Sequence, residues 1–136
     1  LYTRLTNLKR HNPNVKVFIS IGGWAMNNPG PIFNPFSEMS ASAENRQKFI
    51  QSLIGFISNF GFDGVDIDWK YPVASHRGGS PQDKKNYVQL LKDIKAGFIA
   101  SGHPNFGTTF GGPHTDLYLQ NYDLPAMLEI AECVST

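Results

Sequence analysis

The segment from residue 62 to residue 72 carries three aspartates in a stretch that otherwise has the character of a buried strand. It reads Phe62-Asp63-Gly64-Val65-Asp66-Ile67-Asp68-Trp69-Lys70-Tyr71-Pro72. Successive side chains of a β-strand point to opposite faces. One face is therefore charged, with Asp66, Asp68 and Lys70, and the other is apolar, with Val65, Ile67 and Trp69. Because buried charges are costly unless they are paired, this arrangement indicates a functional site better than a stabilising one.

Predicted strands and helices alternate on both sides of this segment. We expect helices over 2–11, 42–60 and 81–101, and a last helix capped by Asp123 that buries Leu128 and Ile130. Strands are expected over 15–21, 62–70 and 106–110, and a further strand is expected to begin at 133. Residues 26–36 are expected to form a loop. Gly61 stands where a helix C-cap belongs, and Ser80 to Asp83 resembles a capping box. Alternation of this kind predicts an α/β fold with parallel strands.

Composition excludes several classes of function. The formal net charge of +1 over 136 residues gives no sign of a nucleic-acid partner. No apolar stretch is long enough to span a bilayer, so we expect no membrane partner. The single Cys133 rules out an internal disulfide, and the four histidines lack metal-ligand spacing, which favours solvated loop positions. We therefore expect no metal and no cofactor.

The acidic segment resembles the D-x-x-D-x-D-x-E signature of glycoside hydrolase family 18, the chitinase family, with Asp63, Asp66 and Asp68 at its aspartates. A second block of that family, S-x-G-G, is matched upstream by Ser20-Ile21-Gly22-Gly23, which Trp24 follows, and Arg77-Gly78-Gly79 resembles the fungal-type branch. The resemblance implies a partial (β/α)₈ TIM barrel, running roughly from the third strand to the fifth helix. It also implies that residues 1–136 are a fragment of one family 18 catalytic domain, in which function lies at the carboxyl ends of the strands.

The sequence departs from the family signature at Lys70, where the family has its catalytic glutamate. In the family this glutamate protonates the leaving oxygen, while the N-acetyl carbonyl of the substrate acts as the nucleophile. The pKa of a lysine is ordinarily ~10.4, so the side chain is a poor proton donor at neutral pH. We therefore expect Lys70 to pair with Asp68 or Asp66. We expect hydrolysis of β-1,4-linked N-acetylglucosamine polymers to be impaired both by Lys70 and by the absence of the remaining barrel strands from this fragment.

The resemblance also assigns the remaining candidate residues. It implies that Asp68 orients the acetamido group of the substrate and that Asp66 tunes the charge of Asp68, whereas Asp63 holds local structure. For Trp24, stacking on a sugar ring and ordinary packing within the protein are equally good interpretations. Tyr71 is a weaker candidate for stacking on a sugar ring. Gly22 and Gly23 shape the substrate-binding turn, and Trp69 belongs to the core.

Two alternatives to a chitinase remain open. A chitinase-like lectin would bind chito-oligosaccharides without cleaving them, and Lys70 fits such a binding module. A cation-dependent phosphoesterase built on Asp66 and Asp68 is the weaker alternative, because Lys70 lies beside the two carboxylates. The family resemblance further implies that the protein is secreted and that its partner is chitin or a chito-oligosaccharide.

Overall fold

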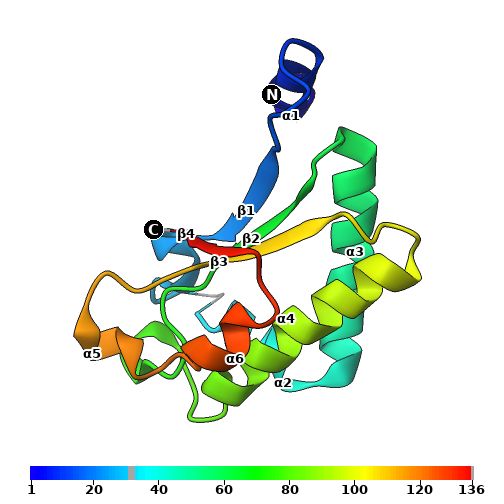
Figure 1. Cartoon of the computed structure of the whole chain (residues 1–136). Helices are drawn as coiled ribbons and strands as arrows, with labels where there is room; N and C mark the ends of the chain where they lie inside the picture. Colours follow the sequence, from blue (N-terminus) through cyan, green and yellow to red (C-terminus); the bar gives the residue numbers. More distant parts are fainter. Residues whose placement is uncertain (31–32, 136) are drawn as a thin grey trace.

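The sheet of the protein consists of four parallel strands. The structure is a computed structural model that describes residues 1–30 and 33–135. The strands are β1 (Phe18–Gly22), β2 (Gly64–Asp68), β3 (Gly107–Gly111) and β4 (Cys133–Ser135), and they lie side by side in chain order. All three pairings are parallel, so the carboxyl ends of the strands meet at one edge of the sheet (Figure 1).

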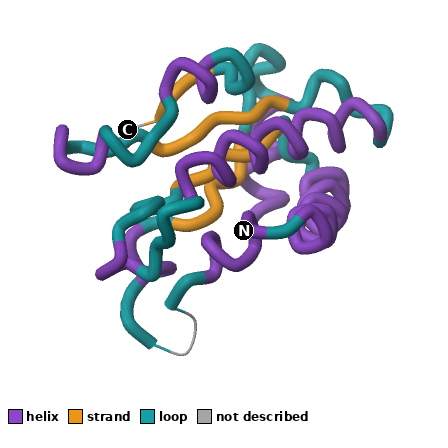
Figure 2. The backbone as a smooth tube through the Cα atoms, turned by 90° about the horizontal axis from the view of Figure 1, so that it is seen from below, coloured by secondary structure: helices purple, strands orange, loops and turns teal. Residues whose placement is uncertain are grey.

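Helices connect the strands and cover one face of the sheet. The α-helices are α1 (Tyr2–Thr6), α2 (Pro35–Ala41), α3 (Ala43–Phe60), α4 (Asp83–Ala100), α5 (Asp116–Leu119) and α6 (Leu124–Leu128), with 3₁₀ turns η1 (Asn7–Arg10), η2 (Trp24–Asn27) and η3 (Ser75–Arg77). Figure 1 shows α3 and α4 on the same side of the sheet, and Figure 2 shows the molecule from below, with helices in front of and beside the strands. None of the helices in the described part of the chain is long and apolar enough to cross a membrane.

The two long helices begin and end at residues that satisfy their terminal backbone groups. The Ser42 hydroxyl accepts a hydrogen bond from the Asn45 amide at 3.1 Å, and Gly61 ends α3 with φ +76°, a conformation that glycine adopts readily. At the start of α4 the Asp83 carboxylate accepts from the Ser80 amide at 2.7 Å. Of the predicted capping box, the hydrogen bond from the Ser80 amide to the Asp83 carboxylate is thus present. The helix begins at Asp83 and not at Pro81.

The core lies between the apolar face of the sheet and the helices. Val65, Ile67 and Trp69 are fully buried, which confirms both the predicted alternation of β2 and the predicted core position of Trp69. The Trp69 ring stacks on Phe36 of α2 at a centroid distance of 5.4 Å. The long helices contribute further fully or almost fully buried side chains: Ile50, Leu53, Ile57, Tyr87, Leu90, Leu91, Ile94 and Phe98.

Three local predictions were wrong. The helix predicted over 2–11 ends at Thr6 and continues as the 3₁₀ turn η1. The loop predicted over 26–36 contains η2 and the start of α2, in which proline occupies a first-turn position where its missing N–H costs nothing; residues 31 and 32 lie outside the described part of the chain. In α6 the fully buried side chain is Met127, whereas Leu128 is 51% exposed. The Asp123 cap and the strand beginning at Cys133 are confirmed.

Candidate active site

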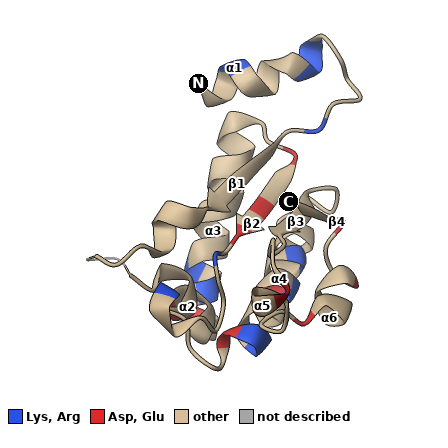
Figure 3. Cartoon of the chain, turned by 90° about the vertical axis from the view of Figure 1, so that its left-hand side faces the viewer, with Lys and Arg blue, Asp and Glu red and all other residues tan. Residues whose placement is uncertain are grey.

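The charged face of β2 lies between two uncharged strands. In the parallel register Asp66 is opposite Ser20 of β1 and Thr109 of β3, and Asp68 is opposite Gly22. Figure 3 shows the acidic positions of β2 between β1 and β3, which carry no charged residue. The sequence-predicted carboxylates therefore lie at the carboxyl-terminal half of the sheet, where substrate-binding loops follow the strands.

Three hydroxyl groups hold the Asp66 carboxylate. Ser20 donates to Oδ2 at 2.7 Å, and Thr109 and Ser135 donate to Oδ1 at 2.8 Å and 2.7 Å. These donors come from β1, β3 and β4, so each of the other strands fixes the orientation of this side chain. The sequence pointed to Ser20 through its motif, but Thr109 and Ser135 could be placed here only by the strand register.

Asp68 fits between two glycines on neighbouring strands. A Cβ atom at Gly22 would lie 2.2 Å from the Asp68 main-chain oxygen, and one at Gly111 would lie 2.3 Å from Asp68 Oδ1. Gly22 also has φ +122°, which L side chains rarely adopt. The amide of Gly23 donates to the Asp68 main-chain oxygen at 2.8 Å. Gly22 and Gly23 thus shape the site through the backbone.

Lys70 extends toward the same carboxylate. Its Nζ atom lies 3.4 Å from Asp68 Oδ1, and its side chain is 15% exposed. Nζ also lies 3.4 Å from Nε2 of His114, in the loop after β3. The predicted pairing of Lys70 with an aspartate of β2 is therefore present, and the aspartate is Asp68. His114 was expected to be a solvated loop residue; it is exposed, but it reaches the site.

The two candidate aromatic side chains differ in accessibility. Trp24 in η2 is 57% exposed, and its ring lies 4.0 Å from the guanidinium carbon of Arg77. Tyr71 is only 6% exposed and stacks on Tyr118 at a centroid distance of 3.8 Å. Trp24 can therefore offer an open ring face to a ligand, whereas most of Tyr71 is covered by protein.

Asp63 lies outside this cluster. Its carboxylate accepts from the amide of Val17 at 2.8 Å and pairs with Lys9 at 2.9 Å, so it joins the start of β2 to the chain before β1. The local structural role expected for Asp63 agrees with these contacts.

Two buried tyrosines hold the main chain of the segment that carries the charged residues. The Tyr87 hydroxyl donates to the main-chain oxygen of Ile67 at 2.8 Å, and that of Tyr122 donates to the main-chain oxygen of Trp69 at 3.0 Å. Burial raises the pKa of both phenols well above its ordinary value, and the negative charge of Asp68 raises it further. Both tyrosines therefore remain neutral donors that fix the backbone carrying the charged face.

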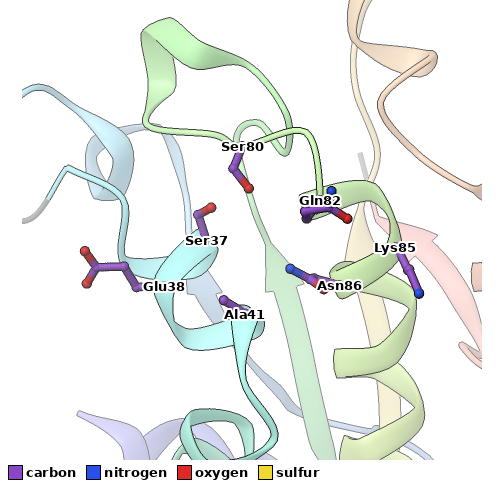
Figure 4. Close-up of a pocket in the computed structure, with 7 residues that line it drawn as sticks. All are labelled: Ser37, Glu38, Ala41, Ser80, Gln82, Lys85 and Asn86. Carbon is purple, nitrogen blue, oxygen red and sulfur yellow. The ribbon is translucent and has the colours of Figure 1, made fainter.

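A separate polar pocket of about 470 Å³ lies between α2 and the first turn of α4 (Figure 4). Ser37 and Ser80 line it, and their hydroxyls donate to Oδ1 of the fully buried Asp83 at 2.6 Å and 2.9 Å. None of the candidate site residues lines this pocket. Among the described residues, no group of three or more histidine, cysteine, aspartate or glutamate side chains is assembled for a metal ion.

Residues 1–134 match the family described as Glycosyl hydrolases family 18. The chain is 41% identical to Chitinase A1 of Niallia circulans over 102 residues, which are 73% of this chain and 14% of that protein. It is 36% identical to the Endochitinase of Manduca sexta over 101 residues, which are 74% of this chain and 17% of that protein.

Solved chitinase structures share the fold over almost the whole chain. The Group IV chitinase of Ostrinia furnacalis in complex with allosamidin superposes with a TM-score of 0.86 and 29% identity, covering 98% of this chain and 34% of the other. The chitinase TsES1 of Trichuris suis gives a TM-score of 0.81 and 31% identity over 99% of this chain and 35% of its own. The predicted partial (β/α)₈ barrel is confirmed, and the chain spans about one third of these solved chains.

Proposed function

The chain belongs to glycosyl hydrolase family 18, and we propose that it forms the carbohydrate-facing part of a domain that acts on β-1,4-linked N-acetylglucosamine polymers, with hydrolysis impaired by Lys70. Residues 1–136 would then be part of one catalytic domain, in a protein that the family resemblance implies to be secreted. The relatives are named as chitinases, which supports chitin or a chito-oligosaccharide as the partner.

The observation that carries this proposal is the position of Lys70 within reach of Asp68 at the charged edge of the sheet. In the family mechanism this position supplies the acid that protonates the leaving oxygen and then acts as a base toward water. An ammonium group has no lone pair to act as that base, and here it is already engaged with the Asp68 carboxylate. Binding residues are retained while the acid–base group is not.

The other residues keep roles that suit sugar binding. Asp68 is placed to accept a hydrogen bond from an acetamido N–H, and Asp66, held by three hydroxyls, sustains the negative charge beside it. The exposed face of Trp24 suits the apolar face of a pyranose ring, with the glycine turn of Gly22 and Gly23 shaping the approach. Tyr71 would contribute mainly by packing beside Trp24, at a ring distance of 6.3 Å.

A non-catalytic lectin is the second candidate, and the contact between Lys70 and Asp68 favours it. The pair neutralises part of the charge at the site, and the ammonium group retains donors for the hydroxyl and carbonyl oxygens of a sugar. Such a chain would grip chito-oligosaccharides without turnover.

The deciding experiment is a calorimetric titration of chitotetraose into the chain, followed by analysis of the mixture for shorter products. Cellotetraose serves as the matched control, because it is a neutral β-1,4-linked tetramer that lacks the acetamido groups that Asp68 would recognise. Binding of chitotetraose without products is the expected result and favours the lectin. Efficient release of products would contradict the impairment by Lys70, and absence of binding would overturn the proposal of sugar recognition by this chain.

A further inference from the structure

Arg77 is a buried cation whose guanidinium group joins two loops at the candidate site. It ends η3 in the loop after β2, and only 4% of the residue is exposed. Among the described residues, no carboxylate lies within salt-bridge distance of it. A buried charge without an ion partner is costly unless other acceptors satisfy its donors, so the contacts of this side chain show what it holds in place.

The guanidinium group donates to both loops at once. Nε donates to the main-chain oxygen of Lys70 at 3.2 Å, Nη1 donates to Oδ1 of Asn28 at 2.9 Å, and Nη2 donates to the main-chain oxygen of Trp24. The contact is reciprocal, because the buried side chain of Asn27 donates to the main-chain oxygen of Arg77 at 3.3 Å. The loop after β1 is therefore fastened to the loop after β2.

The same guanidinium group covers one face of the Trp24 indole. Its carbon atom lies 4.0 Å from the ring centroid, a cation–π contact of the kind worth about 0.5–2 kcal/mol. The edge-on ring of Tyr71 limits the indole on another side at 6.3 Å. More than half of Trp24 remains exposed. Arg77 therefore covers one face of the indole, and the other face is open to solvent.

We infer that Arg77 is a positioning residue that holds the Trp24 indole as a one-sided platform for a pyranose ring and fixes its distance from the main chain at position 70. A sugar stacked on Trp24 is thereby placed at a set distance from the charged face of β2. The platform geometry is a property of the free protein, whereas its use by a sugar rests on the proposed function.

The geometry can be tested without any sugar, because the chain contains only two tryptophans and Trp69 is fully buried. In Arg77→Met we expect a red shift of tryptophan emission and stronger quenching by acrylamide, since the covered indole face opens to solvent. Neither change should occur when Arg77→Met is made in a Trp24→Phe background. Arg46→Met, which removes a partly buried arginine paired with Asp93, is the matched control and should leave Trp24 quenching unchanged.

Two milder variants guard against loss of folding. Arg77→Lys keeps a charge but not the planar set of donors, and Asn28→Ala removes one exposed acceptor from the arrangement. Both should raise quenching to an intermediate level while the far-ultraviolet circular dichroism stays native. Unchanged quenching in folded Arg77 variants would overturn the inference.

The sugar-binding arm is a double-mutant cycle with chitotetraose. We expect Arg77→Met and Trp24→Ala each to weaken binding about tenfold, equivalent to ~1.4 kcal/mol, and the double variant to lose little more than either single one. Additive losses would show that Arg77 acts independently of Trp24 and would contradict the inference. If the unmodified chain binds no sugar, the proposed function fails, while the quenching experiment still decides the role of Arg77.

Discussion

Nζ of Lys70 lies 3.4 Å from Oδ1 of Asp68, so the residue that we propose to occupy the acid position is paired with the carboxylate two residues before it. The pair neutralises part of the charge at the candidate site. Both the predicted loss of hydrolysis and the predicted binding strength depend on this contact.

Replacing Lys70 by glutamate in the full-length protein should restore cleavage of chito-oligosaccharides. A general acid typically contributes ~10²–10⁴-fold in rate, so product release from chitotetraose should rise by about that factor. Lys70→Gln is the control, because it removes the ammonium group without supplying a carboxyl. Equal activity of the two variants would show that position 70 is not the acid position in this chain.

Asp68→Ala should weaken binding of chitotetraose and abolish the preference over cellotetraose. The expected loss is about 1.5–3 kcal/mol, the usual range for a hydrogen bond to a charged group. Calorimetric titration of both sugars measures it, with Asp116→Ala, an exposed aspartate outside the site, as the control. Unaltered affinity and preference would remove the orienting role assigned to Asp68.

Asp83→Ala should lower the free energy of unfolding by about 3–5 kcal/mol, because several buried hydrogen-bond donors lose their acceptor and each such loss costs about 1–3 kcal/mol. Its carboxylate accepts hydrogen bonds from Ser37 of α2 and from Val73 and Ser80 in the connection between β2 and α4. Urea unfolding of the variant provides the measurement. A loss below ~1 kcal/mol, the size of a single neutral hydrogen bond, would show that these contacts are replaceable.

Ser42→Ala should cost about 1 kcal/mol through loss of the N-cap of α3. Ser52→Ala makes the same chemical change at an exposed position within that helix, where alanine has the better helix propensity. Urea midpoints should therefore move in opposite directions for the two variants. A shared direction would argue against the cap as the cause.

Alkaline conditions should destabilise the protein through Tyr87 and Tyr122. Their pKa values are raised in the folded state, chiefly by burial, so the unfolded chain releases its phenolic protons first as pH rises past about 10. The stabilisation that these two protonated phenols contribute is fully present below that pH and decreases above it. Urea unfolding is measured between pH 8 and 11, which covers roughly one unit or more on each side of the ordinary phenol pKa. The free energy of unfolding should decline less steeply with pH in Tyr122→Phe than in the unmodified protein.

Much of the fold was predictable from local pattern. The C-cap of α3 at Gly61, the alternation on β2 and the burial of Trp69 follow from residue type and spacing alone. Helix α2 was missed because the proline and asparagines before it favour a loop, although Pro35 in the first turn was a usable signal. Leu128 was misassigned because a helix as short as α6 leaves its buried face undetermined by spacing.

The candidate site was predictable in its motifs but not in its contacts. The sequence placed Asp66, Asp68 and Lys70 on one face, yet the donors from Thr109 and Ser135 depend on strand register across the sheet. Arg77 was visible only as part of a glycine-rich run. Its contacts with Trp24 and Asn28 depend on two loops that meet in space, and no local pattern encodes that meeting.

The confinement of Asp68 between Gly22 and Gly111 also limits how this protein can evolve. An alanine at Gly22 would collide with the Asp68 main chain, and one at Gly111 would displace the Asp68 carboxylate from its present position, so the shape of this part of the site depends on the absence of side chains at both positions. New specificity would have to arise in the loops after the strands, by changes that leave these two glycines in place.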